Sequence, residues 1–228
     1  RWVGNESGYA GDPCWATYTP HGLDGQAPCP GQTEYKEGEQ GHRNGEFWIP
    51  AEVDVSIRPG WFYHPKEDKK VRTPDNLMKL YFESVGHGAS FLLNIPPDRR
   101  GLIPDNDVAS LREFGQQLDA TVSTDLAQGA AVTASNRRGG DARFAPALVN
   151  DGDRHTYWCT DDAVLTPDVT IELPAPVTFD VVSLREYLPL GLRVDDWALD
   201  QWDGTEWKEF AHGTGIGNQR LWRGDAVT

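Results

Sequence analysis

The sequence has no long hydrophobic run and few cysteines. No apolar stretch approaches the roughly 20 residues of a membrane-spanning helix, so we expect no membrane insertion. The three cysteines, Cys14, Cys29 and Cys159, are too few and too scattered for a disulfide framework or a zinc site. Cys14 and Cys29 could still pair across the loop between them.

Basic residues are also scarce. The 21 Lys and Arg are outnumbered by 35 Asp and Glu, which gives a formal net charge of -14. This balance disfavours nucleic acid and anionic membrane surfaces as partners. A neutral ligand such as a glycan fits better, since Trp, Asp and Asn are the residues that would bind it. Nine Trp and a hydrophobic content of 38% indicate a folded protein.

The chain length and its first residues bear on domain organisation. The 228 residues could form one large domain or two ordinary ones. The chain begins Arg1-Trp2-Val3, with no initiator Met and no targeting segment. We therefore expect a fragment, and its beginning does not identify a compartment.

Side chains that could bind or react with a ligand are most concentrated in residues 47–64, FWIPAEVDVSIRPGWFYH. This segment contains two carboxylates, an arginine, a histidine and five aromatic rings. One interpretation is the wall of a polar-ligand pocket. Aromatic faces bind the C–H faces of a sugar, and carboxylates, Arg and His bind its hydroxyls or act at its anomeric carbon. The other is a strand and turn whose rings are core and whose charges pair with each other. The residue types alone leave both open.

Local signals in the first half predict a loop and a helix. Residues 10–46 are rich in Gly, Pro, Asp, Glu and Gln, which is typical of a long surface loop. Thr73 followed by Pro is typical of a helix start. The spacing then predicts a helix over residues 75–85 that ends at Gly86.

A strand and a second helix follow. The short apolar run at residues 89–95 is stopped by two prolines, which predicts a fully buried strand. Asp105 or Asn106 can cap the next helix, whose apolar residues repeat at helical spacing. Alternation of strand and helix indicates an α/β fold.

The sequence pattern changes after about residue 121. Short β-type runs separated by Pro and Gly clusters indicate an antiparallel sandwich. We expect an α/β domain over residues 1–119, a linker over 120–129 and an all-β domain over 130–228. The predicted strands of the second domain are residues 169–173, 180–186 and 197–202.

Three segments occur in order in the first domain: RWVGNE at residues 1–6, WIPAEVDVSIRPGWFYH at 48–64 and SVGHGASFLLNIPP at 84–97. Together they closely resemble α-L-fucosidases of glycoside hydrolase family 29, most of all the subgroup selective for α-1,3- or α-1,4-linked fucose. The resemblance covers residues 1 to about 118 and implies the C-terminal part of a (β/α)₈-like barrel. Because such a barrel needs about 250 residues, it also implies an incomplete catalytic domain.

The family resemblance implies a retaining hydrolase, and such enzymes use two carboxyl groups about 5 Å apart. It implies that the nucleophilic Asp lies upstream of this chain and that Glu6 is the acid/base, in a loop after a strand end. Such an acid must stay protonated, which requires desolvation or a nearby negative charge. Trp2 could supply an apolar neighbour. Glu52 is the second candidate acid.

The remaining candidates would bind substrate. Trp61 fits a platform for the apolar face and C5 methyl of fucose, or alternatively belongs to the barrel core. Arg58 and His64 could donate hydrogen bonds to sugar hydroxyls or hold the neighbouring carboxylates in place. Trp48 and Glu52, next to the long loop, could face the other sugars of the glycan.

The second domain resembles the discoidin, or coagulation factor 5/8 type C, sandwich, also called carbohydrate-binding module family 32. The resemblance rests on ASNR at residues 134–137, FAPALVNDGD at 144–153, TYW at 156–158 and GTEW at 204–207. It implies a discoidin-like β-sandwich, which we expect to be truncated. In similar modules one loop holds a structural calcium ion, for which the candidate ligands here are Asn150, Asp151, Asp153 and Thr156.

The sequence thus predicts an α/β plus all-β glycoside hydrolase, an exo-acting α-L-fucosidase that needs no cofactor. Its expected partners are fucosylated oligosaccharides or glycoconjugates, met in the periplasm or outside the cell. The alternative is a non-catalytic carbohydrate-binding fragment, because half a barrel leaves strand edges unpaired.

Overall fold

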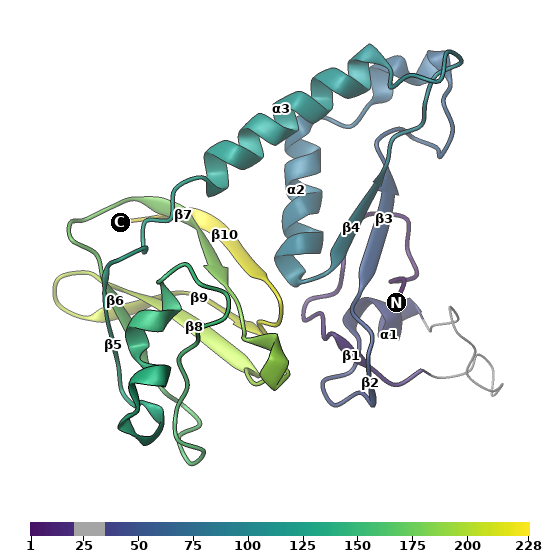
Figure 1. Ribbon diagram of the computed structural model, residues 1–228. Coiled ribbons are helices and arrows are strands. Elements are labelled where there is room, and N and C mark those ends of the chain that lie inside the picture. Colours follow the sequence, from purple (N-terminus) through teal and green to yellow (C-terminus); the bar gives the residue numbers. More distant parts are fainter. Residues whose placement is uncertain (21–34) are drawn as a thin grey trace.

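The computed structural model describes residues 1–20 and 35–228. These residues form two units, one with parallel strands and two long helices and one built of antiparallel strands (Figure 1). The helices and strands, in chain order, are β1 (Thr17–Tyr18), α1 (Tyr35–Gln40), β2 (Phe47–Trp48), β3 (Glu52–Ser56), α2 (Pro74–Ser84), β4 (Ser90–Asn94), α3 (Asp105–Val122), β5 (Ala131–Ala134), β6 (Val169–Glu172), β7 (Phe179–Leu184), β8 (Asp196–Trp202), β9 (Trp207–Thr214) and β10 (Arg220–Val227).

Strands β3 and β4 pair in parallel along their whole length. Successive side chains of a strand point to opposite faces, and in β3 this places Val53 and Val55 on one buried face. Gly8 lies between Val55 and Leu80 of α2, where an added Cβ would come within 3.2 Å of both. The apolar face of β3 therefore packs toward α2, and its polar residues lie on the opposite face.

The strand predicted at residues 89–95 forms as β4, but it is not fully buried. Leu92 is 46% exposed. Its register partner is Asp54, so Leu92 lies on the polar side of the sheet. Helix α2 packs on the opposite, apolar side, and the prediction of full burial is wrong for Leu92 because it lies on the side away from this helix.

Helix α2 begins as predicted. The Oγ1 of Thr73 accepts a hydrogen bond from the backbone N–H of Asn76 at 3.3 Å, which satisfies one of the free donors of the first turn. The helix continues into a 3₁₀ turn over Val85–His87. Gly88, with φ of 84°, ends this turn in the left-handed region. The terminating glycine is thus Gly88 rather than the predicted Gly86.

Helix α3 is capped by Pro104, so neither Asp105 nor Asn106 is its cap residue. Asn106 instead donates its side-chain N–H to the backbone carbonyl of Asp68 at 3.0 Å. The helix continues to Val122, and β5 begins nine residues later at Ala131. No helix within the described residues is long and apolar enough to cross a membrane.

The described parts of residues 10–46 are not a surface loop throughout. Strand β1 pairs antiparallel with β2, and α1 lies between them in the sequence. Trp15 and Tyr18 are buried, at 9% and 1% exposure. These aromatic side chains anchor a segment whose Gly and Pro content suggested a loop. The suggested pairing of Cys14 with Cys29 lies outside the described residues.

The second unit contains three antiparallel pairs, β5 with β6, β7 with β10, and β8 with β9. The three strands predicted there form as β6, β7 and β8, and their antiparallel pairing is confirmed. The ring of Phe210 in β9 makes edge contacts with Phe179 of β7 at 6.1 Å and with Trp222 of β10 at 5.1 Å. These contacts pack the β7–β10 pair against the β8–β9 pair.

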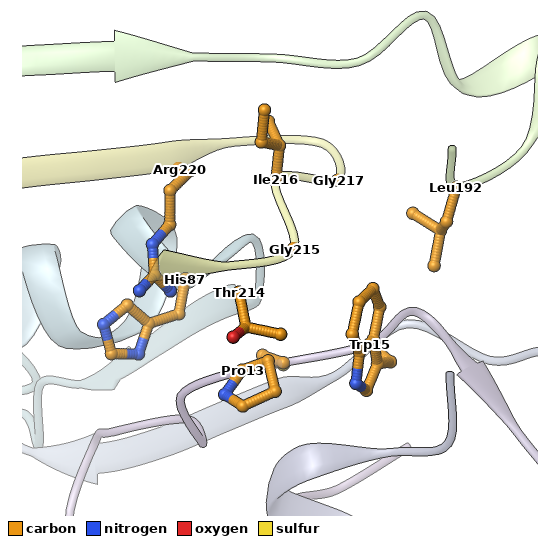
Figure 2. A pocket seen from close by; sticks show the side chains of 10 residues that line it. Pro13, Trp15, His87, Leu192, Thr214, Gly215, Ile216, Gly217 and Arg220 are labelled. Carbon is orange, nitrogen blue, oxygen red and sulfur yellow. The ribbon is translucent and has the colours of Figure 1, made fainter. Parts of the chain in front are cut away.

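The two units meet through charged and apolar contacts. Arg220 donates a hydrogen bond to Oδ1 of Asp12 at 2.6 Å, and Arg43 pairs with Asp195. Leu221 packs so closely on Gly86 that an added Cβ would lie 3.2 Å from it. A cavity of about 10 Å³ between the units has room for about one water molecule (Figure 2).

His87 lies at this junction beside Arg220 (Figure 2). Its side chain is 17% exposed, with Nε2 4.0 Å from the Asp12 carboxylate and Nδ1 3.3 Å from the carbonyl of Ala10. Burial, followed by the positive charge of Arg220, holds the pKa of His87 below its ordinary value. Asp12, the Ala10 carbonyl and Glu83 oppose the shift without cancelling it.

We expect acidification to destabilise the fold through His87. In the unfolded chain His87 takes up its proton near pH 6.5, whereas in the folded chain it does so only at lower pH. The unfolded state therefore binds more protons between these two pKa values, and stability is lost as the pH falls through that window. Urea unfolding at about pH 7.5 and about pH 5.5 should show a larger loss for the wild type than for His87→Gln. Equal losses would contradict this expectation.

Candidate functional site

The site is built at the carboxyl ends of β3 and β4, where side chains of parallel strands meet at one edge. These ends are Ser56 and Asn94, which are direct register partners. The Nδ2 of Asn94 donates to Oγ of Ser56 at 2.9 Å and to the carbonyl of Trp61 at 3.1 Å. The Ser56 hydroxyl donates to the carbonyl of Gly60 at 2.8 Å. The loop that follows β3 is thus tied to the sheet.

Glu6 reaches the same edge from another segment. The first residues run beside β3, with a parallel bridge between Trp2 and Glu52. The loop that follows is held by Asn5, which is 7% exposed and donates its side-chain N–H to Oε1 of Glu39 at 2.9 Å. Glu6, directly after this buried anchor, has an exposed side chain.

The structure brings Glu6 and Trp61 together. The indole Nε1 of Trp61 donates a hydrogen bond to Oε2 of Glu6 at 2.9 Å, although the two are 55 residues apart in the chain. The indole N–H of Trp2, the expected neighbour of Glu6, is directed to Oδ1 of Asp54 at 2.7 Å. An exposed carboxyl beside an aromatic ring is an arrangement that can exchange a proton with a bound sugar.

Glu52 and Trp48 lie elsewhere. Glu52 is the first of five residues in β3. At about 3.3 Å per residue, it lies roughly 13 Å from the carboxyl end of the strand. Trp48, 47% exposed, lines a cavity of about 260 Å³ between the two units, together with Ala51 and Leu188. The structure therefore does not bring Glu52 or Trp48 to the Glu6–Trp61 pair.

Arg58 is a structural residue and not a sugar ligand. Its fully buried guanidinium donates through Nε and Nη2 to both carboxylate oxygens of Asp107, at 2.9 and 2.7 Å, and through Nη1 to Asp68 at 2.9 Å. The hydrogen bonds to Asp107 raise the pKa of Arg58 despite the opposing effect of burial. The structure corrects the expected contacts with sugar hydroxyls or with the carboxylates of β3. Arg58 instead anchors the loop that carries Trp61.

His64 lies at the end of the same loop. Its side chain is exposed, and it precedes the 3₁₀ helix Pro65–Lys70. Its backbone carbonyl accepts a hydrogen bond from the N–H of Glu67 at 2.9 Å. The ring is accessible to a ligand, and its role in sugar binding stays a prediction.

The four candidate calcium ligands have partners within their own region. Asn150 is 7% exposed and donates to the carbonyl of Ala130 at 3.0 Å. The carboxylate of Asp151 accepts hydrogen bonds from the N–H of Asp153 at 2.8 Å and from the hydroxyl of Thr156 at 2.7 Å, which lower its pKa. No group of three or more His, Cys, Asp or Glu within the described residues could hold a metal ion. Calcium binding stays a prediction.

Sequence reasoning missed three residues that build the site: Ser56, Asn94 and Asp107. A polar residue at the last position of a predicted parallel strand was an available signal for Asn94, because functional groups gather at that edge. Asp107 and Arg58 are 49 residues apart, and no local pattern connects them.

Known proteins that are similar to this chain are α-L-fucosidases. Residues 23–122 match the family described as Alpha-L-fucosidase. Alpha-L-fucosidase 1 of Arabidopsis thaliana is 35% identical over 226 residues, which are 98% of this chain and 43% of that protein. A Bacteroides thetaiotaomicron structure whose description assigns it to the α-L-fucosidases is 39% identical with a TM-score of 0.89, covering 100% of this chain and 49% of that one. A Ruminococcus gnavus GH29 fucosidase in complex with fucose is 32% identical with a TM-score of 0.87, covering 100% of this chain and 45% of that one.

The chain spans about half the length of these relatives. Its mixed α/β fold matches the C-terminal part of GH29 fucosidases. Its homologues are named α-L-fucosidase, which is a glycosidase. Over its whole length the chain is thus similar to GH29 α-L-fucosidases.

Proposed function

We propose that the protein containing this chain is a retaining exo-α-L-fucosidase that removes α-1,3- or α-1,4-linked fucose from glycans. The observation that carries the proposal is the exposed Glu6 carboxyl, which is hydrogen-bonded to Trp61 at the carboxyl ends of parallel strands. Barrel enzymes place their catalytic groups at this edge. Likeness to a fucosidase in complex with fucose supports fucosylated oligosaccharides or glycoconjugates as substrates.

In this proposal Glu6 is the acid/base of a double displacement. As an acid it gives its proton to the glycosidic oxygen while the bond from C1 to that oxygen breaks and a second carboxylate attacks C1. As a base it then takes a proton from the water that attacks C1 and releases fucose. The second carboxylate belongs about 5 to 5.5 Å from the first, and we assign it to no residue of this chain.

The fold of the whole protein is part of the same proposal. Two parallel strands with α2 on their apolar side support a (β/α)₈-like barrel. Three antiparallel pairs joined by the Phe210 contacts support a discoidin-like β-sandwich. A periplasmic or extracellular location suits glycan substrates, and cell fractionation tests it.

Product analysis tests the activity. We expect the full-length protein to release fucose from aryl α-L-fucosides and from oligosaccharides with α-1,3 or α-1,4 linkages, with α-1,2-linked fucosides as slower controls. Proton NMR should show α-fucose as the first product, because two displacements at C1 retain configuration. β-Fucose as the first product would contradict the mechanism. Sugar binding without hydrolysis would favour the non-catalytic alternative.

A further inference from the structure

We propose that Trp61 and Asn94 are positioning residues for Glu6: Trp61 holds its carboxyl group, and Asn94 holds Trp61. This inference rests on the proposed function, since it takes Glu6 as the acid/base. It assigns the indole of Trp61 a use different from that of a sugar platform. A platform uses the face of the ring, whereas positioning uses its N–H.

Glu6 needs such support because its side chain is long and exposed. A free Glu side chain has up to about 2 kcal/mol of rotamer entropy to lose on ordering. A general acid must lie within hydrogen-bonding distance of the oxygen it protonates, and a displacement of about 1 Å can cost about 100-fold in rate. The 2.9 Å hydrogen bond from Trp61 restricts the carboxyl to one place before any substrate arrives.

Trp61 is itself held from two sides. Asn94 uses its side-chain Nδ2 for the Trp61 carbonyl and for Ser56, at 3.1 and 2.9 Å, while its backbone carbonyl accepts from the N–H of Ile57 at 3.0 Å. The buried pair of Arg58 with Asp107 fixes the same loop to α3. Because an indole has only two side-chain torsions, a fixed backbone leaves its N–H little freedom. Hydrogen bonds thereby connect Asn94, at the end of β4, through Trp61 to the carboxyl group of Glu6.

Trp61→Phe separates the two uses of the ring, because it keeps an aromatic face and removes the N–H. We expect kcat/KM on an unactivated fucosyl oligosaccharide to fall about 10- to 100-fold in the full-length protein. An aryl fucoside with a good leaving group needs no acid in the first step, which is the step that kcat/KM reports, so its kcat/KM should change little. Trp202→Phe, the same change at a half-exposed position of β8, is the matched control. An equal fall on both substrates, or no fall, would overturn the proposal.

Asn94→Ala tests the second step. It should produce the same substrate-selective loss, and the Asn94→Ala/Trp61→Phe double variant should lose no more than Trp61→Phe alone, because Asn94 acts through Trp61. Losses that multiply in the double variant would overturn the role of Asn94. A residue that only stabilised the fold would lower activity on both substrates alike.

A spectroscopic measurement keeps this proposal separate from the proposed function. With tryptophan indoles labelled by ¹⁵N, the Trp61 signal is the one missing in Trp61→Phe. We expect this signal to move in Glu6→Ala and in Asn94→Ala, and to stay in place in Trp202→Phe. A wild type inactive on both substrates would reject the proposed function alone. An active enzyme whose Trp61 signal does not move in Glu6→Ala would reject the positioning proposal alone.

Discussion

Asp107→Asn is expected to lower the free energy of unfolding by about 3 to 5 kcal/mol, because it leaves the Arg58 charge buried without its main partner. Both side chains are fully buried, and Asp107 accepts two hydrogen bonds from the guanidinium. The substitution changes the shape of Asp107 very little, so loss of charge and of one acceptor dominates the effect. Urea unfolding followed by circular dichroism measures it.

Asp68→Asn is the matched control. Asp68 also pairs with Arg58, at 2.9 Å, but its side chain is 38% exposed. Water screens this pair, and we expect a loss below about 1 kcal/mol. Replacing Arg58 and Asp107 together by Met and Leu should recover much of the stability lost in Asp107→Asn, since no unpaired charge remains. Equal losses for the two Asp variants would show that burial is not the cause.

Glu6→Gln is expected to lower kcat/KM on natural fucosylated glycans about 10²- to 10⁴-fold, the usual contribution of a general acid. Glutamine keeps the size of the side chain and an oxygen that can accept the Trp61 hydrogen bond, but it has no acidic proton to give. Aryl fucosides with good leaving groups should be cleaved much as before in the first step. Steady-state kinetics of the full-length protein on both substrates measures the difference.

Glu52→Gln is the comparison variant, because Glu52 was the second candidate acid. Its place at the start of β3 leads us to expect no selective loss on natural glycans. Equal loss of Glu6→Gln on both substrates would count against Glu6. A selective loss in Glu52→Gln would then assign the acid to Glu52. The catalytic site would in that case lie at the start of β3 and not at its carboxyl end.

The buried ion pair and the site share one loop. Arg58 is fixed by Asp107 of α3, and three residues later Trp61 touches Glu6. A change at Asp107 should therefore reach the site even though the Asp107 side chain is itself fully buried. Stability and site geometry are coupled here through a short, doubly anchored segment.

Local patterns predicted the helices and strands well, because each depends on neighbouring residues. The Thr73-Pro74 start of α2 is an interaction within one helical turn. The short run of apolar residues in β4 was sufficient to predict a strand there. Two local predictions were wrong. Gly88 and not Gly86 ends the helical segment, because the position of the left-handed glycine after a 3₁₀ turn depends on how the chain continues. The predicted burial of Leu92 was wrong because burial depends on which elements cover each face of the sheet.

By itself the sequence determined the class of each half, the order of the main elements and Glu6 as the candidate acid, since composition, short-range spacing and family motifs are all written along the chain. Tertiary structure alone decided which polar side chains meet. It paired Arg58 with Asp107 and hydrogen-bonded the indole of Trp61 to Glu6. It also placed Glu52 at the start of β3, away from the carboxyl end where the site lies. The physical reason is sequence separation: Arg58 and Asp107 are 49 positions apart in the chain, and Glu6 and Trp61 are 55 positions apart. Hydrogen bonds between such distant residues depend on strand register and helix docking, which no local sequence pattern records.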